Sequence, residues 1–174
     1  MPKVLIAFSS KTGVTADVAA MIANVLCVPC DRYDLDREGF WSDAGANSIA
    51  KSPVNAEDYP IIILGTAMYY GRPRKAFLLF CRQQLPALQQ SKLYLYTCGM
   101  AKPEEDEAYL RKTLPPELST AKIPLQHMGG ELRLDQLSPF WRYAMKSRVE
   151  DPNLAPQIDT NAIQTFAQRI RKEL

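Results

Sequence analysis

The chain has 174 residues, 47% of them hydrophobic and 23% charged, and its formal net charge at pH 7 is +2. These values are typical of one globular domain over residues 1–174 with a full core, and they give no indication of nucleic-acid binding. No apolar run approaches the ~20 residues that a membrane-spanning helix needs, and no secretory segment precedes the first apolar run, so we expect a cytoplasmic protein.

The first elements alternate between strand and helix. The apolar run Val4–Phe8 predicts a strand covered on both faces, as in parallel sheets. Apolar residues at helical spacing predict an amphipathic helix over 13–26, and a more polar strand follows over 28–35. Ile61–Leu64 is the most apolar run in the chain and predicts a central strand.

The second half continues the alternation. Pro73 can begin a helix. Glu104–Glu107 is predicted to be an exposed acidic start of a helix, where negative charge complements the helix dipole. The remaining elements are a strand over 93–97, the charged helix over 104–112, a strand over 123–128 and a last helix to 174 that is capped near Asp159 or Thr160.

Strands that alternate with helices predict an α/β sandwich of three layers with a parallel sheet. Pro29 and Pro124 fall inside the second and fifth expected strands, and proline is tolerated mainly at sheet edges. We therefore expect five parallel strands in the order 2-1-3-4-5, with a ligand site beyond the carboxyl ends of strands 1 and 3. Two stretches fit poorly: the helix expected within 36–59 is short or missing, and 129–158 forms a long excursion before the last helix.

Hydroxyl side chains surround one glycine directly after the first strand. A phosphate at a helix N-terminus needs free backbone N–H groups, hydroxyl donors and a close approach of the chain. Ser10, Thr12 and Thr15 supply hydroxyls and Gly13 permits the approach, whereas a helix cap alone would need only one hydroxyl. Neither G-x-x-x-x-G-K-(S/T) nor G-x-G-x-x-G occurs, which excludes a Walker A loop and a dinucleotide fingerprint.

Two glycine-containing loops follow the third and fourth strands, over 65–73 and 97–103. Such loops bring backbone amides against a flat ring, and Tyr69 and Tyr70 are candidates to stack on it. The alternative is that both tyrosines pack the rim of the sheet. Two further residues have open roles: Cys98 tunes a bound ring or is a small packing residue, and His127, the sole histidine, is catalytic or structural.

Residues 10–15, S-K-T-G-V-T, resemble the flavodoxin phosphate motif (S/T)-x-T-G-x-T, which binds FMN. The resemblance implies an FMN-dependent redox protein without catalytic side chains or metal ligands, in which Thr12, Gly13 and Thr15 contact the phosphate. It implies a cofactor site that comprises Ser9, Ser10, Lys11, Thr12, Gly13, Val14, Thr15, Thr66, Ala67, Met68, Tyr69, Tyr70, Gly71, Thr97, Cys98, Gly99 and Met100.

A finer resemblance links the chain to the flavodoxin-domain family that includes menaquinone-dependent protoporphyrinogen oxidase. It rests on the loop after the third strand and on Gly130, Leu132 and Leu137 after the fifth, while Thr66-Ala67 departs from the usual A-S. It implies an oxidoreductase that passes electrons from a reduced small molecule to a quinone. The alternatives are an electron carrier that docks to redox partner proteins and a binding module that has lost FMN.

Residues 131–149 combine aromatic, apolar and basic side chains. Ser138 and Pro139 predict a helix start, and Trp141 lies among Arg142, Lys146 and Arg148. One interpretation is a helix packed on the domain or on a second copy in a homodimer. The other is a surface for a quinone, a porphyrin or the inner face of the membrane, with peripheral contact.

The C-x-x-C motif of Cys27 and Cys30 stands alone among the four cysteines. A zinc site needs a second pair, and a thioredoxin-type redox pair opens a helix, whereas this pair follows one. Cytoplasmic thiols are also reduced. The pattern favours two small packing residues.

Overall fold

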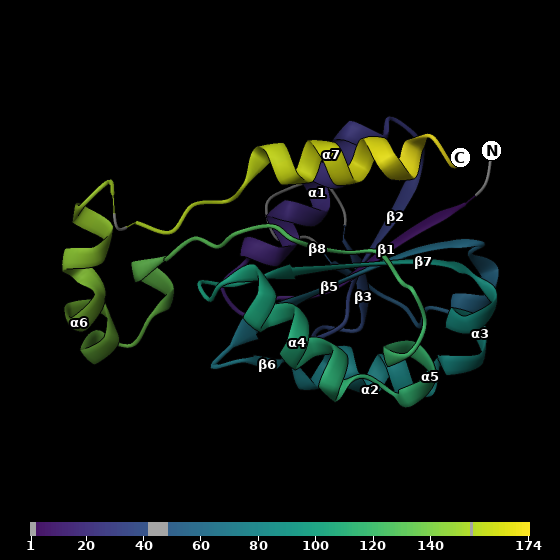
Figure 1. Ribbon diagram of the computed structural model, residues 1–174, viewed down its shortest axis with the longest axis horizontal. Helices are drawn as coiled ribbons and strands as arrows, with labels where there is room; N and C mark the ends of the chain where they lie inside the picture. The colour runs from purple at the N-terminus through teal and green to yellow at the C-terminus, as the bar shows by residue number, and fades with distance from the viewer. Residues whose placement is uncertain (1–2, 42–48, 154) are drawn as a thin grey trace.

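The computed structural model describes residues 3–41, 49–153 and 155–174. A twisted sheet lies between two layers of helices, as Figure 1 shows. One face is covered by α1 (Val14–Leu26) and α7 (Thr160–Arg171), and the other by α2 (Lys75–Gln83), α3 (Leu85–Gln90), α4 (Pro103–Thr113) and α5 (Pro116–Ser119). The expected three-layer α/β sandwich is therefore confirmed.

Five neighbouring parallel strands make up most of the sheet. In sheet order they are β2 (Cys30–Asp34), β1 (Val4–Ser9), β5 (Ile61–Tyr69), β7 (Lys92–Cys98) and β8 (Leu125–His127). Side chains of a strand alternate between faces. Leu5 and Ala7 accordingly enter the core under α2, whereas Ile6 and Phe8 enter the core under α1. Burial on both faces explains why this strand is apolar throughout.

The expectation of a five-stranded, wholly parallel sheet is wrong. β3 (Gly39–Trp41) and β4 (Ile49–Lys51) continue the sheet beyond β2 as antiparallel strands, and β6 (Arg72–Pro73) pairs with β5. β2 is thus not an edge: Pro29 precedes it, so the strand keeps its hydrogen-bonding groups on both sides. Pro124 likewise precedes β8, which ends the described sheet.

The stretch 36–59 was expected to lack a full helix. Its described part holds β3, β4 and one 3-10 turn, η1 (Ala56–Asp58), while residues 42–48 lie outside the described residues. Tyr33 of β2 and Phe40 of β3 stack edge to face with ring centroids 5.1 Å apart. An antiparallel pair therefore follows β2 where a crossover helix is usual.

β5 is longer than the apolar run that predicts it. The segment from Gly65 to Tyr69, expected to be a loop, continues the strand. Tyr70 and Gly71 have φ of 50° and 70° and turn the chain back, so that Pro73 pairs with Met68. Positive φ at two successive turn residues is typical of tight hairpins. Since Pro73 belongs to this hairpin, α2 begins two residues later than expected.

The excursion 129–158 leaves the sheet and returns to it at one point. Gly129 bridges Ile158, and the Asp159 N–H donates to the Met128 carbonyl at 2.9 Å. Between them lie η2 (Leu134–Gln136) and α6 (Pro139–Glu150), which stands apart from the sheet in Figure 1. The expected helix start at Pro139 is confirmed.

α7 follows the excursion and packs on α1. Asp159 caps it, because its Oδ1 accepts a hydrogen bond from the Ala162 N–H at 2.9 Å. Ile163, Phe166 and Ile170 are buried in the core that α1 shares. Among the described residues, no helix combines the length and apolar character that crossing a bilayer requires.

Candidate functional site

A cavity of about 530 Å³ opens at the carboxyl ends of β1, β5 and β7. The loops after these strands form its floor, and the excursion forms one wall. Of the residues expected in a cofactor site, those that line the cavity are Lys11, Thr12, Val14, Thr15, Ala67, Met68, Tyr69, Tyr70, Gly71, Cys98, Gly99 and Met100. Those outside its lining are Ser9, Ser10, Gly13, Thr66 and Thr97.

A side-chain hydrogen bond stabilises the loop after β1. Ser10 Oγ accepts a hydrogen bond from the Gly13 N–H at 3.0 Å, so this hydroxyl stabilises the turn. Gly13 has φ of 90°, a conformation that favours glycine. Among the described residues, no side chain forms a capping hydrogen bond at the start of α1. The first N–H groups of a helix need acceptors, which makes this end suited to an anion.

Two buried polar groups at the cavity have no hydrogen-bond partner among the described residues. They are the Thr15 hydroxyl, which neighbours the Cys98 thiol, and both carboxylate oxygens of Asp106, of which Oδ2 lies 3.3 Å from His127 Nδ1. Both side chains are fully buried and line the cavity. A buried polar group without a partner costs roughly 1–3 kcal/mol. The site therefore has the chemistry to receive a polar ligand at the start of α1 and beside β7.

Ser9 and Thr66 instead join a hydrogen-bond network with Asp36 and Arg74, none of which lines the cavity. Ser9 Oγ donates to Asp36 Oδ2 at 2.7 Å, and Arg74 Nη2 pairs with Asp36 Oδ1 at 2.7 Å. The Arg74 N–H donates to Thr66 Oγ1 at 3.1 Å. The Ser10 N–H also donates to Asp36, at 3.0 Å. These bonds fix the ends of β1 and β5, and sequence reasoning missed both charged members.

The ends of β5 and β7 lie side by side at the cavity, where Ala67 pairs with Cys98. Lys11 Nζ lies 5.5 Å from the centre of the Tyr69 ring, whereas Tyr70 is 88% exposed at the rim. Gly99 packs so closely that a methyl group there would lie 2.7 Å from Asp106 Oδ2. A methyl group on Gly130 would lie 2.7 Å from the Gly99 carbonyl oxygen. Small residues thus keep this end of the cavity open.

Asp106 corrects the expectation of a wholly exposed acidic helix start. It is fully buried, because Asp106 lies on the same side of α4 as Leu110, and Leu114 directly after the helix is buried as well. Their four-residue spacing was the signal in the sequence. His127 Nδ1 lies 3.3 Å from Asp106 Oδ2 and 3.2 Å from Thr97 Oγ1. His127 does not line the cavity, but it contacts Asp106, which does.

Cys98 is buried at the end of β7. Burial raises the pKa of its thiol to about 12, with the neighbouring Thr15 hydroxyl acting in the opposite direction. The thiol is therefore protonated near neutral pH. This environment fits the packing interpretation of Cys98 rather than that of a reactive thiolate.

The excursion forms one wall of the cavity, although the set of residues expected in the cofactor site includes none of it. Its apolar members are Leu132, Leu137, Trp141 and Met145, and its charged members are Glu131, Arg133 and Arg148. Residues 131–149 carry the aromatic and basic pattern, but the sequence does not reveal that they turn back over the first loop.

The family of the chain follows from its sequence match. A family model described as "Flavodoxin domain" matches residues 5–151. The chain belongs to the flavodoxin domain family. The match ends before α7, so one flavodoxin domain over 1–174 remains our prediction. No curated protein matches the chain.

Solved flavodoxin structures share the fold. Oxidised flavodoxin 1 from Bacillus cereus is 16% identical with a TM-score of 0.53, and 99% of each chain is covered. Fusobacterium nucleatum flavodoxin bound to flavin mononucleotide is 14% identical with a TM-score of 0.52, covering 100% of this chain and 99% of that one. A WrbA-like flavodoxin from Agrobacterium tumefaciens is 14% identical with a TM-score of 0.55, covering 99% and 97%. At these identities the likeness concerns the fold alone.

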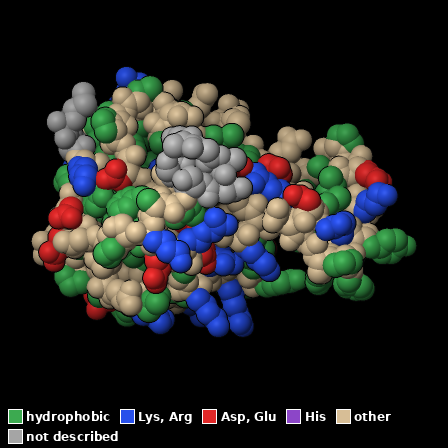
Figure 2. Space-filling view, turned by 180° about the vertical axis from the view of Figure 1, so that it is seen from behind, with side chains coloured by type: hydrophobic (Ala, Val, Ile, Leu, Met, Phe, Trp, Pro, Cys, Tyr) green, Lys and Arg blue, Asp and Glu red, His purple; other side chains and the backbone are tan. Residues whose placement is uncertain are grey.

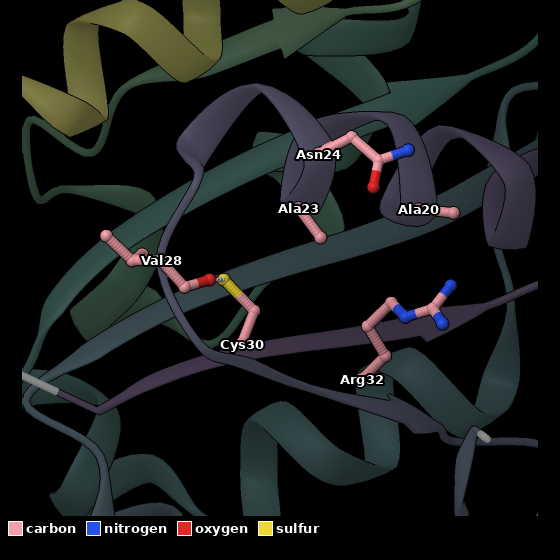
Figure 3. A pocket seen from close by; sticks show the side chains of 6 residues that line it. All are labelled: Ala20, Ala23, Asn24, Val28, Cys30 and Arg32. Atoms are coloured by element: carbon pink, nitrogen blue, oxygen red, sulfur yellow. Dashed lines mark hydrogen bonds between the residues drawn. The ribbon is translucent and has the colours of Figure 1, made fainter. Parts of the chain in front are cut away.

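A second cavity of about 400 Å³ lies at the opposite end of the flavodoxin sheet, between α1 and the start of β2. Figure 3 shows its lining, in which the Cys30 thiol donates to the Val28 carbonyl at 3.3 Å. Burial raises the pKa of Cys30 to about 11. Cys27 and Cys30 are both free thiols. The cavity has neither the glycine loop nor the buried unpartnered groups of the first one.

Proposed function

We propose that this flavodoxin-domain protein binds FMN in the cavity at the end of β1, β5 and β7 and works as a redox protein. The observation that carries the proposal is the buried Thr15 hydroxyl, which has no partner among the described residues and lies at the uncapped start of α1. The family match and the FMN bound to the Fusobacterium flavodoxin support the same cofactor.

The residues that line the cavity have separate tasks. The loop N–H groups with Thr12 and Thr15 hold the phosphate, and the loops after β5 and β7 hold the ring. FMN, when bound, supplies the electron transfer. Leu132 and Trp141 exclude water from the open side. The hydrogen bonds of Asp36 and Arg74 keep the first loop in place.

Flavin binding tests the proposal. The purified apo protein is titrated with FMN, and quenching of flavin fluorescence is followed. The double variant Thr12→Ala, Thr15→Ala is expected to lose at least about tenfold in affinity, since it removes two hydroxyl donors to a charged group. Thr165→Ala on the exposed side of α7 is the matched control and should bind as the wild type does. Equal affinity of the double variant would place the site elsewhere.

For the reaction, we propose an oxidoreductase that passes electrons from a reduced small molecule to a quinone, as in menaquinone-dependent protoporphyrinogen oxidase. The apolar wall of Leu132, Leu137 and Trp141 favours it, because an apolar substrate needs such a surface beside the ring. The alternative is a carrier that docks to a redox partner protein. Oxidation of protoporphyrinogen with a menaquinone analogue supports the enzyme; electron exchange only with a partner reductase supports the carrier.

α6 bears the remaining partner proposals. Phe140 and Tyr143 are 73% and 85% exposed, and the projecting lobe in Figure 2 carries green apolar and blue basic side chains. Peripheral contact with an anionic membrane and a homodimer are both proposals for this face. Flotation with anionic vesicles supports the first, and sedimentation as a dimer supports the second. A monomer that does not float contradicts both.

A further inference from the structure

Arg133 reaches from the excursion onto the first loop. Its Nη1 donates to the Thr12 carbonyl at 3.1 Å, and its Nη2 forms an ion pair with the Asp17 carboxylate on the first turn of α1. A methyl group on Gly13 would lie 2.8 Å from Nη1. The guanidinium therefore packs directly on the glycine that opens the loop.

The guanidinium retains donors for a further anion. Its Nε lies 3.4 Å from Glu131 Oε1, the third of its contacts. A guanidinium has five N–H groups, so these contacts use at most three of them among the described residues. Arg133 also lines the same cavity as Thr12 and Thr15. A positive group with unused donors thus shares the cavity with the buried Thr15 hydroxyl.

We propose that Arg133 binds the phosphate of the cofactor and makes the site selective for FMN over riboflavin; this inference rests on the proposed function. A guanidinium matches the geometry of phosphate oxygens and forms two parallel hydrogen bonds with them. The uncapped α1 N-terminus and the unpartnered Thr15 hydroxyl are the other two parts of the same anion site. The phosphate motif in residues 10–15 contains no such arginine.

The ion pair between Asp17 and Arg133 gives a second test of the proposal, in which a substitution should strengthen FMN binding. In the absence of an anion its carboxylate neutralises Arg133, and it competes with the phosphate for the same donors. Removing its charge should therefore tighten FMN binding. If Arg133 only braces the loop, the Asp17 ion pair is part of the brace, and removing it should weaken binding.

The experiment compares FMN and riboflavin on the full apo protein. Fluorescence titration gives the dissociation constants for the wild type, Arg133→Gln, Asp17→Asn and the control Arg142→Gln. Arg142 lies in the same excursion, but its Nε donates to the Leu134 carbonyl at 3.0 Å, and it does not line the cavity. Inorganic phosphate serves as a competitor of FMN.

Arg133→Gln is expected to weaken FMN by about 10- to 100-fold with riboflavin unchanged, the size of a charged hydrogen-bond pair. Asp17→Asn is expected to tighten FMN about two- to fivefold, as at a half-exposed ion pair. Phosphate should compete with FMN less well in Arg133→Gln, and Arg142→Gln should match the wild type.

Equal weakening of FMN and riboflavin in Arg133→Gln, together with weaker FMN binding in Asp17→Asn, would show a bracing role and overturn the inference alone. FMN affinity unchanged in Arg133→Gln would overturn it as well. Binding of neither flavin by the wild type contradicts the proposed function and the inference with it.

Discussion

The carboxyl end of the sheet and the excursion 129–158 are built in different ways. At the sheet end, buried strands fix the loops, and Asp36 and Arg74 hold the first of them. In the excursion, no described residue of α6 is fully buried, and Arg142 ties the helix to η2. Binding elements on a rigid scaffold are positioned by the core, whereas a segment outside the core is free to vary in sequence. One side of the cavity thus rests on the core, whereas the other rests on local contacts of the excursion.

The largest expected effect is a difference in the free energy of unfolding between substitutions in the sheet core and in α6. Phe77 is fully buried under the sheet, and Phe140 is 73% exposed on α6. Phe77→Ala is expected to lower the free energy of unfolding by about 3–5 kcal/mol because it leaves a cavity. Phe140→Ala should change it by less than about 0.5 kcal/mol. Urea denaturation measures both, and a large loss in Phe140→Ala would show that α6 is integral to the core.

Gly13→Ala changes the loop after β1 at the point where Arg133 of the excursion contacts it. The positive φ of 90° strains any other residue, and the new methyl group pushes Arg133 off the loop. The free energy of unfolding should fall by about 1–3 kcal/mol, and FMN should bind more weakly. Denaturation and flavin titration of the same preparation measure the two effects. An unchanged FMN affinity would mean that the cofactor does not use this loop.

Thr15→Val, at the carboxyl end of the sheet, is expected to change the stability of the apo protein and its FMN affinity in opposite directions. The variant removes a buried hydroxyl that has no partner among the described residues, so the apo protein should gain about 1 kcal/mol in stability. FMN affinity should fall, because we propose that this hydroxyl donates a hydrogen bond to the phosphate. Thr165→Val, on the exposed side of α7, is the control for both measurements. A loss of apo stability would indicate that Thr15 serves the fold alone.

Thiol reactivity is the smallest expected effect. Burial raises the pKa of Cys81 and Cys98 to about 12, so both thiols stay protonated well above neutral pH. Thiolates rather than thiols react with alkylating reagents. At pH 8, mass spectrometry should find the exposed Cys27 alkylated and both buried thiols intact. Early labelling of Cys98 would show that the cavity end of β7 opens to solvent.

Much of the scaffold is readable from short patterns. Continuous apolar runs predict β1, β5 and β7, and the hydroxyl cluster over 9–15 marks the loop that lines the cavity. β3 was not predicted, because a three-residue strand has no pattern of its own and is defined by its pairing with β2 and β4. Pro29 was expected inside an edge strand. It instead precedes β2, so it does not restrict the place of that strand in the sheet.

The missed site residues depend on long-range contacts. The ion pair of Arg133 and Asp17 joins residues 116 positions apart, and the local sequence of neither residue reveals the other. Asp106 was hidden in an acidic run, although its spacing to Leu110 fits a buried helix face. Local patterns therefore predict the loop after β1, while the wall that the excursion forms beside it becomes visible only in three dimensions.

The most direct test of the account is a titration of the purified apo protein with FMN, followed by flavin absorbance and fluorescence. The account predicts uptake of one FMN per chain, with binding that inorganic phosphate weakens and that Thr15→Val reduces. A protein that takes up no FMN under these conditions would contradict it.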